Sequence, residues 1–180
     1  MNLRNIFLDT EFVTTLPGPE GLLSIALTDE HGHDYYAVNA DADFTTARTN
    51  PWLTANVLPH LPLTPDGDLD HTHPDVKPRT QIARETALYL RHDNGDAHLH
   101  AWYAAQDVVR LHQLWDNDWD YMPAYVPRWA TDIQTLIHLA GNPPLLPAQT
   151  TPEHHALNDA RYNRELHTFA VHELRHGIRL

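Results

Sequence analysis

One short stretch near the beginning of the chain, Asn5 to Val13, limits most strongly what this sequence can fold into. It has the sequence NIFLDTEFV, in which two apolar runs flank Asp9, Thr10 and Glu11. A short run this rich in large apolar residues predicts a strand that is buried on both faces of a sheet. Because side chains alternate along a strand, Asp9 and Glu11 would point to the same side, about 7 Å apart.

Two carboxylates in such a place repel each other and lose hydration, which costs free energy. A hard divalent cation relieves that cost, because ions of this kind take oxygen ligands. The alternative is that Asp9 and Glu11 are two solvated acids at the end of a strand. The stretch alone does not separate these two interpretations.

Composition narrows the classes of protein to which the chain can belong. It has 180 residues, 42% of them hydrophobic, which predicts one domain with a substantial core. It has no cysteine, which excludes thiol catalysis and thiolate zinc sites. No apolar stretch approaches the roughly 20 residues of a membrane span, and no secretory signal pattern precedes the first strand. We therefore expect a cytoplasmic protein.

The net charge of −12 argues against broad electrostatic binding to nucleic acid, which depends on neutralising many phosphates. It remains compatible with an enzyme that grips a few phosphates through metal ions.

The pattern of apolar residues predicts a mixed α/β sheet. Strands are expected at 5–13, 22–28, 34–39, 97–103 and 126–130, and helices at 52–58, 78–92, 106–115, 133–140 and 155–176. Asn94-Gly95 is expected to turn the chain before the fourth strand. The proline-rich remainder of residues 44–77 is expected to be a long loop of functional importance. Strands first, then alternating helices and strands, predict a five-stranded mixed sheet with helices on both faces.

Three further side chains are expected near the first two acids. Asp107 lies at the start of a helix directly after a strand, Asp159 lies in the first turns of the last helix, and His154 precedes that helix. Side chains at strand ends and helix starts can converge at one edge of a sheet. Four carboxylates there would hold two divalent ions, an arrangement that clamps the attacking and leaving oxygens of phosphoryl transfer. Histidine exchanges protons near neutral pH, so His154 would take the proton from the attacking water.

Each of these residues also has an ordinary structural interpretation. Asp107 is suited to be a helix N-cap, and Asp159 to be a solvated acid favoured by the helix dipole. His155 competes with His154, because it lies four residues before Asp159 and on the same helical face. Spacing alone slightly favours His155.

The order of these motifs resembles the DEDDh exonucleases of the DnaQ-like, ribonuclease H-like superfamily. The matching residues are Asp9-Thr10-Glu11, Asp107 and the segment HHALND from His154 to Asp159. Outside the motifs, the segments DTEF, LLSI, VLPHLP, QIARE, HAWYAAQD, LHQLW and VPRW resemble the small 3′–5′ exoribonucleases of the mycobacterial type. This similarity covers nearly the whole chain. Gln106 is a departure, because an aromatic residue is expected there in the nearest relatives.

The resemblance implies a ribonuclease H-like fold and an exonuclease that removes nucleoside 5′-monophosphates from RNA 3′ ends. It implies two Mg²⁺ or Mn²⁺ ions, whose ligands would be Asp9, Glu11, Asp107 and Asp159. The general base would be the first residue of the H-x-A-x-x-D pattern, which is His154. A homodimer is also implied.

Three residues are candidate substrate contacts because of their positions. Thr10 and Phe12 flank the acids, so we expect them to meet the terminal nucleotide, with the Phe12 ring stacked on a base. Ser24 on the second strand is expected beside the terminal ribose, where a contact with the 2′-hydroxyl would separate RNA from DNA. The alternative functions are a DNA exonuclease and a catalytically silent nucleic-acid-binding module on the same fold.

Overall fold

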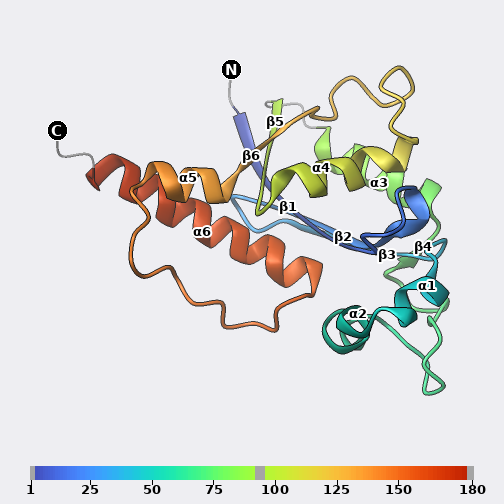
Figure 1. The fold of residues 1–180 in the computed structure, drawn as a ribbon. Helices are drawn as coiled ribbons and strands as arrows, with labels where there is room; N and C mark the ends of the chain where they lie inside the picture. The colour runs from blue at the N-terminus through green and yellow to red at the C-terminus, as the bar shows by residue number, and fades with distance from the viewer. Residues whose placement is uncertain (1–2, 92–95, 178–180) are drawn as a thin grey trace.

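A six-stranded mixed sheet forms the centre of the computed structural model, which describes residues 3–91 and 96–177 (Figure 1). Its strands are β1 (Leu3–Phe12), β2 (Leu22–Asp29), β3 (Asp34–Asn39), β4 (Val76–Lys77), β5 (Asp96–Ala101) and β6 (Ala130–Asp132). Their order across the sheet is β4-β3-β2-β1-β5-β6. β1 runs antiparallel to β2 and parallel to β5, β2 and β3 are antiparallel, and the two edge strands pair in parallel. The strand that carries Asp9 and Glu11 therefore lies between two neighbours in the middle of the sheet.

Helices cover both faces of this sheet (Figure 1). They are α1 (Phe44–Thr49), α2 (Pro51–Asn56), α3 (Arg79–Leu90), α4 (Ala104–His112), α5 (Ile133–Leu139) and α6 (Ala156–Gly177), with short 3-10 turns at Pro19–Gly21, Leu58–His60 and Gln113–Trp115. α3 and α4 pack on one face, and α6 packs on the other against β1 and β2. None of the helices in the described part of the chain combines the length and apolar character needed to cross a bilayer.

Small residues bring the start of α6 close to the sheet. Ala156 and Ala160 on the helix are fully buried against Ala26 of β2. Next to them, the Asn163 side chain donates a hydrogen bond to the carbonyl oxygen of Leu8 in β1, at 3.1 Å. This close packing fixes the first turns of α6 beside the strand that carries the two acids.

The sheet has one strand more than the five that the sequence predicted. The additional edge strand β4 contains only Val76 and Lys77, which pair with Val38 and Asn39 of β3. So short a pairing depends on tertiary neighbours, and no periodic pattern in the sequence marks it. The last strand lies at Ala130–Asp132 and not at residues 126–130. The predicted turn at Asn94-Gly95 lies outside the described residues.

Residues 44–77 contain more regular structure than the single helix at 52–58 and the long loop that the sequence predicted. α1 begins after Asp43, whose carboxylate accepts a hydrogen bond from the backbone N–H of Thr46 at 2.9 Å. Phe44, Leu53 and Leu61 are buried in one hydrophobic cluster with Val38 and other residues of the sheet. Only the part from residue 61 to residue 75 is irregular. This segment is therefore a packed helical cover over one end of the sheet.

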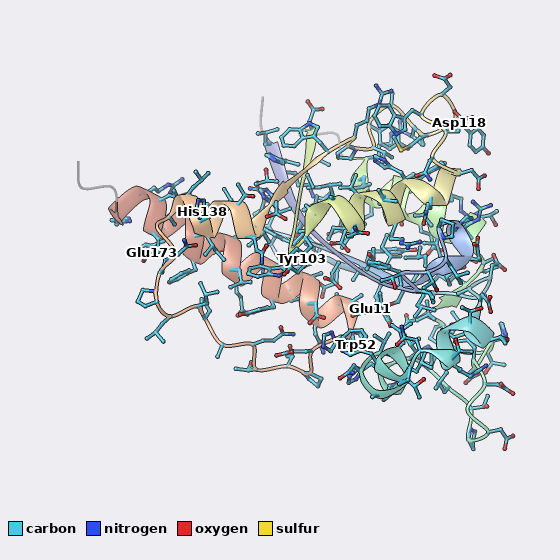
Figure 2. The ribbon with its side chains drawn as sticks, viewed as in Figure 1. Glu11, Trp52, Tyr103, Asp118, His138 and Glu173 are labelled. Carbon is cyan, nitrogen blue, oxygen red and sulfur yellow. The ribbon has the colours of Figure 1, made fainter. Side chains whose placement is uncertain are left out.

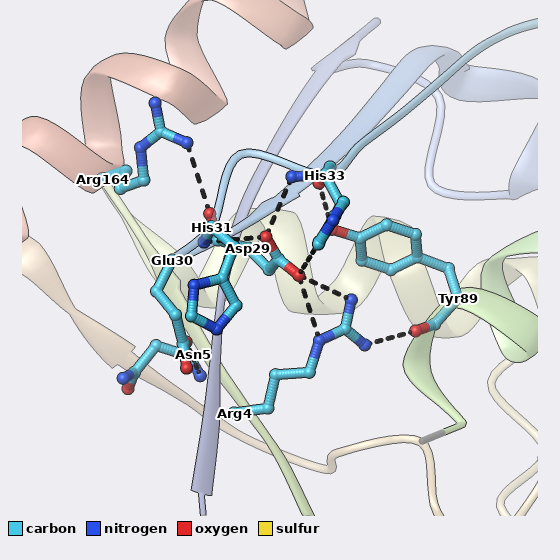
Figure 3. A network of polar contacts seen from close by, with 8 residues as sticks. All are labelled: Arg4, Asn5, Asp29, Glu30, His31, His33, Tyr89 and Arg164. Carbon is cyan, nitrogen blue, oxygen red and sulfur yellow. Dashed lines mark hydrogen bonds and ion pairs between the residues drawn. The ribbon is translucent and has the colours of Figure 1, made fainter. Parts of the chain in front are cut away.

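A buried polar network closes the hairpin between β2 and β3 (Figure 3). Asp29, which is 2% exposed, accepts hydrogen bonds from the backbone N–H groups of His31 and His33, both at 2.9 Å. Its other oxygen contacts Nδ1 of His33 at 2.9 Å and Nη2 of Arg4 at 3.2 Å. Arg4 also donates to the carbonyl of Tyr89 at 2.7 Å. Burial alone would raise the pKa of Asp29, but the hydrogen bonds from His33, His31 and Arg4 outweigh it and lower the pKa.

Replacing Asp29 by alanine should lower the free energy of unfolding by about 3 kcal/mol at pH 7, because the largely buried Arg4 guanidinium loses its anionic partner. Since the pKa is lower in the folded state, the stabilisation is present above about pH 4 and is lost as the pH falls through the folded value. Urea unfolding of the wild type, of Asp29→Ala and of the exposed control Asp66→Ala measures the effect. An Asp29 variant as stable as the Asp66 control would contradict this account.

Three histidine rings lie against one another between the sheet and α6: His98 stacks on His100, and His167 is tilted against His100. The ring centroids of His98 and His100 are 4.5 Å apart, and those of His100 and His167 are 4.2 Å apart. Nε2 of the buried His100 lies 2.9 Å from Oδ1 of Asn5. Burial, together with the two neighbouring histidines, lowers the pKa of His100 to about 3. Burial also lowers the pKa of His98 and of His167.

This cluster should make the fold sensitive to acid. Below about pH 6.5 the unfolded chain binds more protons at these histidines than the folded chain does, so stability falls as the pH decreases from there. His100→Gln removes the most strongly shifted group and should reduce the slope of unfolding free energy against pH by up to about 1.4 kcal/mol per pH unit. Urea unfolding of the wild type and of His100→Gln between pH 7 and pH 5 measures the slope of unfolding free energy against pH for each protein. Equal slopes for the two proteins would show that His100 is not a source of the sensitivity.

Candidate active site

One cavity of about 820 Å³ opens where β1, α4 and the start of α6 meet. Five of the residues that line it are the four acids and the histidine that the sequence singled out: Asp9, Glu11, Asp107, Asp159 and His154. Figure 2 labels two of the lining residues, Glu11 and Trp52, beside the N-terminal end of α6. The fold thus gathers side chains from three distant parts of the chain into one place.

Glu11, His154 and Asp159 form a group in the cavity that could hold a metal ion. One carboxylate oxygen of each acid and one ring nitrogen of the histidine lie within 4.8 Å of one another. Asp9 and Asp107 line the cavity next to this group. Atoms at this spacing can close around a divalent cation with little movement.

The backbone at His154 turns sharply before α6 begins. Its φ angle is 62°, in the left-handed region that residues with a Cβ atom rarely occupy. Its N–H donates to Oδ2 of Asp159 at 2.8 Å, and its ring contacts Trp52 edge to face at a centroid distance of 4.8 Å. These contacts place the imidazole on the cavity wall.

His155 faces a different part of the molecule. Its ring stacks on Tyr36 at a centroid distance of 4.7 Å, and it lies outside the cavity lining. His155 would share a helical face with Asp159 only if the helix already included His155. The helix begins at Ala156, and the turn at His154 sends the two rings in different directions.

Asp107 is oriented by a hydrogen bond from the central strand. Oγ1 of Thr10 donates to Oδ1 of Asp107 at 2.6 Å, and both side chains are buried. The N-cap of α4 is Tyr103, in the left-handed region, and Oδ2 of Asp132 accepts the backbone N–H of Ala104 at 3.0 Å. Asp107 therefore lies within the first turn and is not the N-cap, which leaves its carboxylate directed at β1 and the cavity.

Burial and like charge raise the pKa values of the two strand acids. Burial raises the pKa of Asp9 well above its ordinary value, and the charges of Asp107, Glu11 and Asp159 raise it further. Burial and the charges of Asp159 and Asp107 raise the pKa of Glu11 to about 8. Ionising both groups near neutral pH is therefore costly without a compensating positive charge.

The pKa values of the two acids on the helices, Asp107 and Asp159, are also raised. Burial raises the pKa of Asp107 to about 7, although the hydrogen bond from Thr10 opposes it. Burial also raises the pKa of Asp159, while hydrogen bonds from Gln149 and from the N–H of His154 oppose it. Four carboxylates held together in this way have the hard oxygen donors and the excess negative charge that suit divalent cations. The residues present fit such ions.

The candidate substrate contacts have different surroundings in the structure. Thr10 and Phe12 both line the cavity. The guanidinium of Arg110 lies over the Phe12 ring, with its Cζ atom 4.5 Å from the ring centroid. Ser24 pairs with Glu11 in the sheet, but it is 1% exposed and lies outside the cavity lining. The structure therefore does not bring Ser24 to the cavity surface, because the alternation of the strand gives the face of a residue but not its depth.

Several cavity residues were not found from the sequence, among them Trp52, Asp132 and Gln149. Trp52 comes from α2, within the predicted helix 52–58, and no local pattern places that helix at the cavity. Asp132 caps α5 by accepting the N–H of Thr135 at 2.8 Å, and an acid before a helix could have signalled this role. Gln149 belongs to an irregular segment, and no local pattern marks it.

Comparison with known proteins gives two similar sequences. No family model matches the chain. The 3′-5′ exoribonuclease Rv2179c of Mycobacterium tuberculosis strain H37Rv is 36% identical over 156 residues, which are 86% of this chain and 86% of that protein. The 3′-5′ exoribonuclease MT2234.1 of strain CDC 1551 gives the same values.

Proposed function

This chain belongs to the family of these 3′-5′ exoribonucleases, and we propose that it hydrolyses phosphodiester bonds at RNA 3′ ends and releases nucleoside 5′-monophosphates. The observation that carries the proposal is the single cavity in which four carboxylates and one histidine meet. The same residues follow the order of the DEDDh motif. A ribonuclease H-like fold of the DnaQ-like type is part of this proposal.

The proposed enzyme uses two divalent cations, Mg²⁺ or Mn²⁺, held by Asp9, Glu11, Asp107 and Asp159. When bound, such ions supply the positive charge that stabilises the transferring phosphoryl group and the departing oxygen. Thr10 keeps the Asp107 carboxylate turned toward β1 through its 2.6 Å hydrogen bond.

His154 acts as the general base in this proposal. Its imidazole takes a proton from the attacking water while the water oxygen bonds to the phosphorus of the terminal nucleotide. The bond from that phosphorus to the 3′-oxygen of the preceding nucleotide breaks, so the terminal nucleotide leaves with a 5′-phosphate. Asp159 holds the backbone of His154 in its left-handed turn, which keeps the ring on the cavity wall. Trp52 and Phe12 offer aromatic faces on which bases can stack.

Matched RNA and DNA oligonucleotides with a 3′ overhang test the proposal. Each is incubated with the protein and Mn²⁺, the products are identified by mass spectrometry, and a chelator is then added. We expect RNA to shorten from its 3′ end, nucleoside 5′-monophosphates to accumulate, and the reaction to stop on chelation. Preferred digestion of DNA would instead support a DNA exonuclease, and intact oligonucleotides would support a silent binding module. Assembly as a homodimer and a cytoplasmic location stay predictions.

A further inference from the structure

The segment that joins α5 to α6 reaches the cavity along the outside of α6. Figure 1 shows it running beside the helix from the end of α5 to the start of α6. We call residues 142–153 the strap. The strap contains no helix or strand, and Leu146 and Gln149 from it line the cavity. The strap therefore forms one wall of the site, and its position affects the shape of the cavity.

Few polar contacts hold the strap to α6. Oη of Tyr162 donates to the carbonyl of Pro147 at 2.7 Å, and Nδ2 of Asn158 donates to the carbonyl of Pro152 at 3.0 Å. The third contact differs from these, because it ends on a cavity acid. Nε2 of Gln149 donates to Oδ1 of Asp159 at 2.5 Å.

The Gln149 contact and the backbone of His154 hold the Asp159 carboxylate from two sides. Gln149 donates to Oδ1, and the N–H of His154 donates to Oδ2 at 2.8 Å. A carboxylate oxygen has two acceptor sites, so each oxygen keeps one for another partner. The carboxylate is thereby fixed in its plane while it can still bind a cation.

Hydrogen bonds to a metal ligand commonly decide how well the ligand binds. They fix its orientation, and their loss typically costs about 10- to 100-fold in metal affinity. In this molecule the side chain that donates to Asp159, Gln149, comes from the strap and not from α6. Because the donor belongs to a separate segment, the position of that segment is coupled to the orientation of the Asp159 carboxylate.

We infer that Gln149 is a positioning residue for Asp159: its amide holds the carboxylate in the orientation that binds a divalent cation, and the same bond holds the strap to the site. This inference rests on the proposed function. A Gln149 side chain that cannot donate therefore weakens cation binding and loosens the strap together.

Calorimetric titration with Mn²⁺ alone tests this inference on four proteins: the wild type, Gln149→Ala, Gln149→Met and Thr150→Ala. Methionine has nearly the length of glutamine but no donor, so it separates hydrogen bonding from packing. Thr150 is an exposed neighbour on the strap and gives the matched control. We expect both Gln149 variants to bind Mn²⁺ about 10-fold or more weakly, and Thr150→Ala to bind like the wild type.

Hydrogen exchange of residues 142–153 gives a second readout that does not depend on activity. Mn²⁺ should slow the hydrogen exchange of the strap's backbone amides in the wild type and in Thr150→Ala. The slowing should be smaller in the two Gln149 variants. A Gln149→Met protein that binds Mn²⁺ as tightly as the wild type would overturn the inference and leave the proposed function standing. A wild type that binds no Mn²⁺ would overturn the proposed function, and the inference with it.

Discussion

Replacing Asp9 by asparagine should abolish RNA cleavage and at the same time stabilise the metal-free protein. Asparagine keeps the shape of the side chain but loses the negative charge needed to hold a cation. We expect the turnover of single-stranded RNA to fall by about 10³-fold or more, because cation binding supplies several kcal/mol of transition-state stabilisation.

The gain in stability has the same physical origin. Burial and the charges of Asp107, Glu11 and Asp159 raise the pKa of Asp9, so the ionised carboxylate destabilises the folded state. In a chelator at pH 8, Asp9→Asn should raise the free energy of unfolding by about 1–2 kcal/mol. The gain should shrink as the pH falls, because the folded wild type then takes up the proton at Asp9.

Urea unfolding in a chelator and RNA turnover with Mn²⁺ measure the two effects on the same preparations. The exposed Asp66→Asn is the control, and it should change neither quantity. Near-normal turnover by Asp9→Asn would refute its role as a metal ligand. An inactive variant that is also less stable in the chelator would show that Asp9 has a structural role.

Replacing His154 by alanine should lower kcat by about 10²- to 10⁴-fold and leave Mn²⁺ affinity near the wild-type value. The matched control is His155→Ala, which should retain most of the activity because that ring stacks on Tyr36 outside the cavity. A general base contributes to the chemical step, whereas a metal ligand also contributes to cation binding. Single-turnover kinetics on RNA, together with calorimetric titration with Mn²⁺, separates these roles.

Three outcomes distinguish the alternatives for the histidines. Loss of activity in His155→Ala with an active His154→Ala would restore the interpretation based on spacing. Loss of Mn²⁺ affinity in His154→Ala would make His154 a metal ligand, which its place beside Glu11 and Asp159 permits. Loss of kcat alone in His154→Ala is the result that the proposed mechanism requires.

The parts of the site that the sequence reveals are those with local signals. Asp9 and Glu11 are recognisable because a buried strand with alternate carboxylates is unusual. Asp107 and Asp159 are recognisable because each lies at the start of an amphipathic helix. The end of the strand and the starts of the two helices meet at one edge of the sheet. In the structure, the side chains of all four acids line one cavity.

The parts that the sequence does not reveal depend on contacts between distant segments. Strand β4 exists because two residues meet β3, and Gln149 reaches Asp159 because the strap follows α6 back to its start. Ser24 shows a related limit, since it pairs with Glu11 in the sheet, but strand alternation does not reveal that it is buried. The choice between His154 and His155 also depended on a backbone turn that spacing cannot show.

Anomalous diffraction from a crystal soaked in Mn²⁺ would show whether the four acids bind the cations. We expect anomalous peaks inside the cavity, within coordination distance of the Asp9 carboxylate and of the other three acids, with the His154 ring facing them. A cavity without such a peak at high Mn²⁺ concentration, or a peak bound only by residues other than Asp9, would contradict this expectation.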